Sequence, residues 1–227
     1  MFKAFFVLTI CAGFGLFFLP TLPEARVVYA TGSLLILAYF IVATAGNIID
    51  KTDRLSIELF LSKPFSRRDV ILADFLGTVT AVSVLSLLLS LGLWIVFGVR
   101  QNEWSHVVIS LCFSLSVGFS MLYCFVILTG LLIRNVSIVI ITWVSYVYVW
   151  SFMLETREDF VIAKNPSVNI ILDAIYYSLP QTFAIIKVFA RFTFGTVNDF
   201  LPLIFSLVSG AAALIFAVFI LNGRDID

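Results

Sequence analysis

The sequence is poor in the residues on which soluble proteins and metalloproteins depend. Only 12% of its 227 residues are charged, acidic and basic residues are equal in number, and there is one histidine. A chain without net positive charge has no general attraction for nucleic acid, so we expect no nucleic-acid partner. Its three cysteines form no CxxC pair, and all of them fall inside apolar runs. Apolar packing is therefore a better interpretation of them than a metal site or a disulfide.

Sequence motifs for catalysis are also missing. The chain contains neither GxxxxGKS nor GxxxxGKT, so we expect that it does not bind and hydrolyse ATP with Mg²⁺ by itself. HExxH and GxSxG do not occur either. The histidine, His106, falls at the expected outer start of a span, where an interfacial position explains it better than proton or metal chemistry. We therefore expect a chain that is not an enzyme and has no metal or cofactor of its own.

Long hydrophobic runs make up most of the sequence. Hydrophobic residues make up 61% of it, 24 residues are Phe, and the mean hydropathy is +1.10. These values predict an all-α, polytopic membrane protein, because about 20 apolar residues cross a bilayer as a helix. We expect one domain, 1–227, and interpret the first apolar run as a retained span rather than a signal peptide. The six expected spans are approximately 4–19, 27–49, 73–98, 106–133, 136–154 and 201–221.

Basic residues of the short loops predict the orientation. With the N-terminus inside, most of them lie on the inner side, as the positive-inside rule requires. We expect a multi-pass protein of the cell's inner (cytoplasmic) membrane with both termini in the cytoplasm. The inner residues are Lys3, Lys51, Arg54, Lys63, Arg67, Arg68, Arg134 and Arg224, and the outer ones are Arg26 and Arg100.

The most charged part of the chain, residues 50–72, falls on this inner side. It predicts a short elbow helix that lies along the inner membrane face and ends near Ser62. Lys63–Pro64 would stop this helix, and Ser66 with Asp69 would cap a second helix that runs into the third span. On residue chemistry alone, both anionic lipid and a docked cytoplasmic protein fit as the partner of the elbow.

A resemblance favours the docked protein. The stretch Ser56–Gly77, SIELFLSKPFSRRDVILADFLG, resembles the cytoplasmic segment of ABC-2-type permeases, the membrane subunits of one class of ATP-driven exporter. The usual pattern there reads close to TLELLLSKPISRREIILGKFLG, and the ELxLSKPxSRR core is shared. There are two departures: Asp53-Arg54-Leu55 takes the place of the Arg-Glu-x-Gly that often comes just before this stretch, and Asp74 stands where a basic residue is common. An acid inside the membrane boundary needs a partner, and the candidates are Arg67 and the headgroup layer.

The resemblance implies a function. The elbow would be a coupling helix seated on a cytoplasmic P-loop ATPase subunit, which binds ATP and Mg²⁺ and drives substrate export. A second permease chain, identical or related, would complete the transporter. A membrane scaffold or assembly factor that recruits a cytoplasmic protein without transport is the alternative. The implied ATPase-interface residues are Arg54, Ser56, Ile57, Glu58, Phe60, Leu61, Lys63, Pro64, Arg67 and Arg68.

The outer segment, about 155–200, is too apolar and too short for a soluble domain. Pro166 and Pro180 each stand at an expected helix start. The stretch 183–192 places Lys187 and Arg191 on one face of a helix that would lie at, or dip into, the outer membrane surface. In the family that the chain resembles, re-entrant or interfacial helices occur at this place before the last span.

Two further patterns predict contacts inside the membrane. Trp143 and Tyr146 share one face of the fifth span and are candidates to line a path for an amphipathic substrate. Small residues also recur at helix-packing spacing, which predicts close approach of helices within the chain or at a dimer face. These residues are Ser206, Gly210, Ala213 and Ala217 in the sixth span, and Ser110, Ser114 and Gly118 in the fourth.

Overall fold

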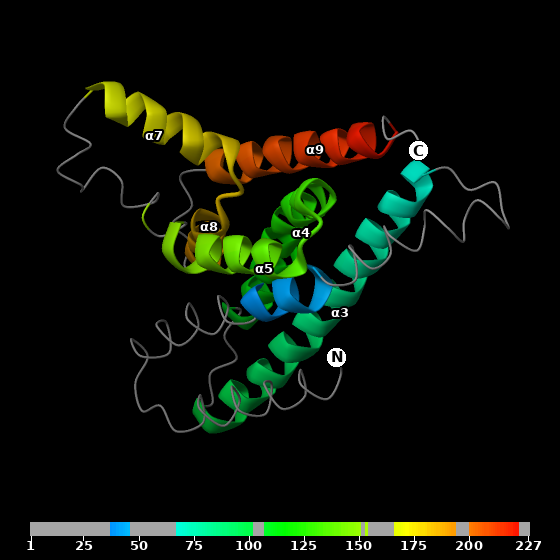
Figure 1. Ribbon diagram of the computed structural model, residues 1–227. Coiled ribbons are helices and arrows are strands. Elements are labelled where there is room, and N and C mark those ends of the chain that lie inside the picture. The colour runs from blue at the N-terminus through cyan, green and yellow to red at the C-terminus, as the bar shows by residue number, and fades with distance from the viewer. Residues whose placement is uncertain are drawn as a thin grey trace, which may run out of the picture.

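The structure is a computed structural model that describes residues 37–45, 67–101, 107–150, 153, 166–193 and 200–222. Every regular element in these ranges is a helix (Figure 1). The all-α prediction is therefore confirmed for this part of the chain. The elements are α3 (Arg67–Gln101), α4 (Val107–Ile133), α5 (Val136–Ser145), the π-helix η1 (Tyr146–Trp150), α7 (Pro166–Ser178), α8 (Thr182–Thr193) and α9 (Leu201–Asn222), and residues 37–45 are also helical.

Three of these helices are long and apolar enough to cross a membrane, which confirms that the chain has the character of a membrane protein. The candidate spans are Arg68–Leu88, Cys112–Ile133 and Leu201–Leu221. α4 and α9 reproduce the expected spans 106–133 and 201–221 to within one residue at each end. The expected span 4–19 and most of 27–49 lie outside the described residues, and 136–154 appears as a shorter apolar helix over 136–150. A total of six spans stays a prediction.

α3 is longer than the expected span 73–98. It begins at Arg67 and runs without a break to Gln101, a length of 35 residues or about 52 Å. The helix expected after Ser66 and the third span are thus one helix. This length exceeds the thickness of a bilayer's hydrocarbon core, which is about 30 Å.

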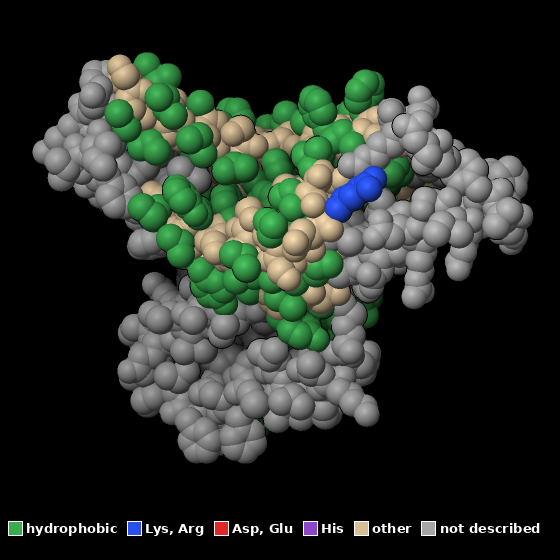
Figure 2. All heavy atoms as spheres, viewed as in Figure 1, with side chains coloured by type: hydrophobic (Ala, Val, Ile, Leu, Met, Phe, Trp, Pro, Cys, Tyr) green, Lys and Arg blue, Asp and Glu red, His purple; other side chains and the backbone are tan. Residues whose placement is uncertain are grey.

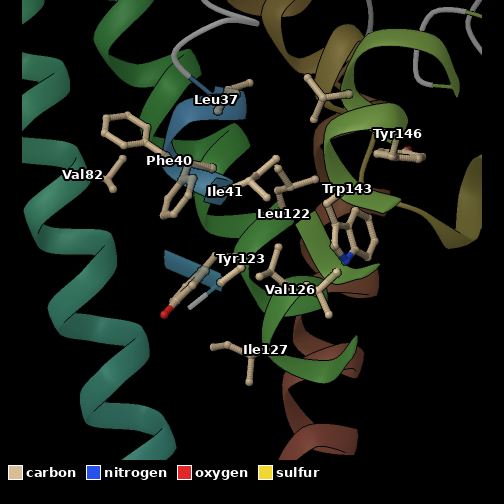
Figure 3. Packing of buried hydrophobic residues seen from close by; sticks show 14 of the residues in the cluster. Leu37, Phe40, Ile41, Val82, Leu122, Tyr123, Val126, Ile127, Trp143 and Tyr146 are labelled. Carbon is tan, nitrogen blue, oxygen red and sulfur yellow. The ribbon is translucent and has the colours of Figure 1, made fainter. Parts of the chain in front are cut away.

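α4 is the central helix of the bundle. It packs against α3, α5, α8 and α9, and segment 37–45 lies beside it (Figure 1). The core forms where these helices meet, and Phe40 of segment 37–45 places its ring edge-on to Phe119 of α4 at 5.5 Å between centroids. Figure 3 shows Phe40 and Ile41 of the segment pointing into the same cluster as Val82 of α3. The largest fully buried side chains include Tyr123, Phe119, Leu37, Ile41, Leu115 and Leu122.

The boundary between α4 and α5 falls at Arg134–Asn135, between the expected spans 106–133 and 136–154. Arg134 takes a left-handed backbone conformation with φ 51°, and its N–H donates to the Gly130 carbonyl at 3.1 Å. This is the αL form of a helix C-cap, which glycine usually makes. The Asn135 side chain then accepts from the Ile138 N–H at 3.2 Å and caps α5. Two residues are enough to connect the two helices because each of them closes one helix end.

The described part of segment 155–200 contains two short helices, close to the two places where the sequence predicted helix starts. α7 begins at Pro166, and α8 begins at Thr182, two residues after Pro180. At 13 and 12 residues they measure about 20 and 18 Å, too short to cross the membrane. α8 packs against α4 and buries Ala184, Ile185 and Ile186, so it enters the bundle rather than only covering its surface. The side chains of Lys187 and Arg191 lie outside the described part.

The surface of the described part is largely apolar. Figure 2 shows hydrophobic side chains covering most of the described part of one face. Large residues such as Leu76 of α3, Ile170 of α7 and Phe219 of α9 are 61%, 70% and 74% exposed. Apolar exposure of this extent fits contact with lipid or with another membrane chain.

Candidate functional site

The coupling-helix residues lie mostly outside the described ranges. This holds for Arg54, Ser56, Ile57, Glu58, Phe60, Leu61, Lys63 and Pro64. Arg67 is the first residue of α3, and Arg68 is exposed in the same first turn. Asp69 also lies in this turn, where an acidic residue stabilises the positive end of a helix. The proposed ATPase contact therefore remains a prediction, while the start of α3 directly after the motif is a feature of the structure.

A polar cluster joins α3 to α4 near this start. Tyr123 of α4 donates a hydrogen bond to Asp74 Oδ2 of α3 at 2.7 Å. The Tyr123 Oη also lies 3.3 Å from Thr78 Oγ1, whose hydroxyl can donate to it. Asp74 is about 10 Å along the helix axis from Arg67. The acid that fits the permease pattern least thus has a defined partner on the central helix.

Aromatic rings hold Tyr123 in place. Its side chain is fully buried, and its ring stacks on Phe119 at 5.3 Å and on Phe75 at 6.2 Å between centroids. Figure 3 shows the phenol oxygen pointing toward α3. A hydrogen bond to a carboxylate is about twice as strong as one between neutral groups. The cluster is therefore a firm, directional link between α3 and α4.

Sequence reasoning found one half of this cluster. It marked Asp74 because an acid inside a span requires a partner, and it named Arg67 and the headgroup layer as candidates. The partner that the structure shows is Tyr123, and the Arg67 side chain lies outside the described part. No periodicity in α4 distinguishes Tyr123 as the partner, because the contact depends on the register between two helices.

A second polar cluster surrounds the turn between α7 and α8. Tyr146 of η1 donates to the Pro180 carbonyl at 2.8 Å. The Gln181 backbone N–H donates to Ser206 Oγ of α9 at 3.0 Å, and the Gln181 side-chain Nε2 donates to the Tyr176 carbonyl at 3.2 Å. Pro180, Gln181 and Ser206 are all buried. This turn is thus tied to η1 on one side and α9 on the other.

The same turn brings together two residues for which the sequence predicted separate roles. Tyr146 was expected on a substrate path and Ser206 in a helix-packing stripe. In the structure, both bind adjacent residues of the turn. Tyr146 is also the first residue of a π-helix, an irregularity that often accompanies function. The α7–α8 turn is therefore a second candidate functional site, where η1 and α9 meet.

Trp143 is fixed between α4 and α5. Its Nε1 donates to Thr129 Oγ1 at 2.7 Å, and its ring contacts Phe125 at 5.6 Å and Tyr146 at 5.4 Å between centroids. Trp143 and Tyr146 are 4% and 6% exposed. Both side chains are therefore packed and hydrogen-bonded in this conformation, and their role in a substrate path stays a prediction.

The small residues of α9 lie on the face that meets the rest of the bundle. Ser206, Gly210, Ala213 and Ala217 are all buried. A Cβ atom on Gly210 would lie 3.0 Å from the Met121 Sδ atom and 3.6 Å from the Met121 Cα atom, so α9 and α4 approach closely here. The Ser110, Ser114 and Gly118 stripe of α4 is buried as well. These stripes lie inside the chain, and the opposite face of α9 exposes Val208, Ile215 and Phe219.

Within the described residues, no group of three or more His, Cys, Asp and Glu side chains could hold a metal ion. Cys112 and Cys124 are buried free thiols. The chain matches no protein-family model, and no curated protein sequence is significantly similar to it.

Proposed function

We propose that this chain is the membrane-spanning permease subunit of an ATP-driven ABC-2-type transporter. The observation that carries the proposal is the Ser56–Gly77 stretch, whose ELxLSKPxSRR core resembles the coupling segment of that family. A separate P-loop ATPase chain binds ATP and Mg²⁺, because this chain has no motif for either. The apolar, all-helical character of the described part supports the proposal.

The continuity of α3 supports a route for coupling. The motif ends inside α3, so a displacement of the elbow moves this long helix directly. The Asp74–Tyr123 hydrogen bond then carries the displacement to α4, which also contacts α8 and α9. In this mechanism Glu58 makes a charged contact with the ATPase, and Arg67 and Arg68 anchor the elbow to the ATPase or to lipid.

The α7–α8 pair supports the same proposal. Both helices are too short to span the membrane, they precede the last long helix, and α8 is buried against α4. Re-entrant helices at this place are expected of the permease family. Export of an amphipathic substrate by a dimer of this chain, with itself or with a related permease, completes the proposed function.

Co-purification with the ATPase tests the interface. We expect Glu58→Lys to abolish recovery of a P-loop ATPase with the permease from native membranes, since the substitution places a positive charge in a charged contact. Arg134→Glu is the matched control, because it reverses one charge at an exposed position, expected on the same side of the membrane, outside the motif. Undiminished co-purification of the Glu58→Lys protein would refute the interface assignment.

Nucleotide turnover separates the transporter from the scaffold. The co-purified complex should hydrolyse ATP faster when its cargo is added, and mass spectrometry of ligands retained by the complex identifies that cargo. A complex that binds the ATPase yet shows no stimulation by any retained ligand would favour the scaffold.

A further inference from the structure

Two buried serines of α3 have hydroxyl groups without a partner. Ser86 and Ser90 are 1% and 3% exposed, and neither Oγ atom makes a hydrogen bond with any residue that the structure describes. Serines in membrane helices commonly bond back to a carbonyl of the preceding turn, as Ser120 of α4 does. Ser86 and Ser90 do not. Native structures avoid unpaired buried hydroxyls, so two of them one turn apart indicate a missing hydrogen-bonding group.

The two serines lie on the side of α3 that faces α4. Thr78, Val82, Ser86 and Ser90 follow one another at four-residue spacing and therefore lie along one side of α3. Thr78 contacts Tyr123 of α4, and Val82 lies in the buried cluster (Figure 3). Ser86 and Ser90 continue this side, so they face the interior of the bundle.

α4 presents polar groups at the same level. The Cys112 thiol lies beside Ser90 and beside Ser116, although it makes no hydrogen bond of good geometry to Ser90 Oγ. Thr78 lies beside Tyr123 and Ser90 lies beside Cys112, so the two helices run antiparallel. Ser116, one turn after Cys112, is then level with Ser86, one turn before Ser90. We call these four residues, Ser86, Ser90, Cys112 and Ser116, the α3–α4 seam.

We propose that the α3–α4 seam is a binding site for water, with one molecule bridging Ser86 and Ser90. Residues four apart on a helix have Cβ atoms about 5–6 Å apart. One water with two hydrogen bonds of about 2.8 Å spans that separation. A buried water typically makes about three hydrogen bonds, and Cys112 or Ser116 supplies the third. Val82 and Phe119 separate this water from the Asp74–Tyr123 cluster and close the seam toward the inner end.

The sign of a stability change tests the site. The double variant Ser86→Ala, Ser90→Ala removes both anchors of the water. If water is bound, we expect the thermal unfolding midpoint in detergent to fall by about 2–4 °C, which is the shift expected for one lost interaction in a chain of this size. If the seam is dry, alanine removes an unpaired hydroxyl at each position, and an unchanged or raised midpoint overturns the proposal. Ser137→Ala, at an exposed position of α5, is the control for serine loss.

The native thiols give a second, spectroscopic readout. In a Cys11→Ala protein, the S–H infrared bands of Cys112 and Cys124 are followed after transfer to D₂O. Cys124 is the matched control, since it is buried in the same helix and its thiol bonds to the Ser120 carbonyl at 3.3 Å. We expect rapid S–H to S–D conversion at Cys112 and slow conversion at Cys124, with loss of the rapid phase in the double serine variant. Equally slow conversion at both thiols in the Cys11→Ala protein overturns the proposal.

Discussion

The two long interfaces of α4 are built in different ways. Toward α3, the contact relies on polar side chains that reach across, namely Tyr123 with Asp74 and Thr78. Toward α9, it relies on small residues, and at Gly210 the α9 backbone lies close to Met121. Lipid offers no hydrophobic drive for helix association, so packing and hydrogen bonds are the available means. This protein uses one of them on each side of the same helix.

The two interfaces of α4 should respond differently when the helices move. The Asp74–Tyr123 hydrogen bond joins α3 to α4 and tolerates small changes in the angle between them, whereas a close backbone approach allows only one fit. In the proposed transport cycle, the bond therefore carries a displacement of α3 to α4 while the angle between the two helices adjusts, and α9 follows α4 as a unit. The α7–α8 turn, which binds Ser206 of α9, would move with that unit.

The largest effect is expected from filling the α4–α9 contact. Gly210→Leu forces a branched side chain against Met121, whose sulfur already lies 3.0 Å from the position of a Cβ. Overpacking of this kind costs about 1–3 kcal/mol, which a thermal unfolding scan in detergent detects. Gly77→Leu is the control, because Gly77 is exposed on α3 and a Cβ there meets nothing within 4 Å. Equal midpoints for the two variants would contradict close packing at Gly210.

A smaller loss is expected from the α3–α4 link. Tyr123→Phe leaves the ring stack intact but removes the hydroxyl that binds Asp74, at a cost of about 0.5–1.5 kcal/mol, because the bond is only partly buried. Asp74→Asn keeps a hydrogen-bond acceptor without the charge and should cost less. A double-mutant cycle over these two changes measures the coupling, because residues in contact give non-additive effects. Additive midpoint shifts would show that the two side chains do not act together.

The smallest effect, and the one gain, is expected where α4 turns into α5. Arg134→Gly removes the strain of a side chain at φ 51° and should raise stability by about 1 kcal/mol. Arg134→Ala also deletes the charge but retains a Cβ, so it should give no such gain. The unfolding midpoints of the two variants separate backbone strain from charge. Arg134 lies in neither long interface, so its midpoint shift is the reference against which the shifts of the two interface variants are compared.

Much of the fold is readable from local features of the sequence. α4 and α9 lie where uninterrupted apolar runs predict them, and the break at Arg134–Asn135 lies where two polar residues interrupt one such run. Pro166 marks the first residue of α7. These features are predictable because hydrophobic length, proline and capping residues act over a few neighbouring residues. The start of α3 at Arg67 follows from the cap that Ser66 and Asp69 predict, and the helix runs through the expected span 73–98 to Gln101.

The sequence by itself determined that this is a helical membrane protein, and it singled out Asp74 as an acid that needs a partner. Only the tertiary structure decided that the partner is Tyr123 and that Tyr146 and Ser206 meet at the α7–α8 turn. It also decided that two buried serines of α3 have no hydrogen-bond partner among the residues that the structure describes. The physical reason is register: which side chains meet across two helices depends on their relative rotation and translation, and these follow from packing of the whole bundle.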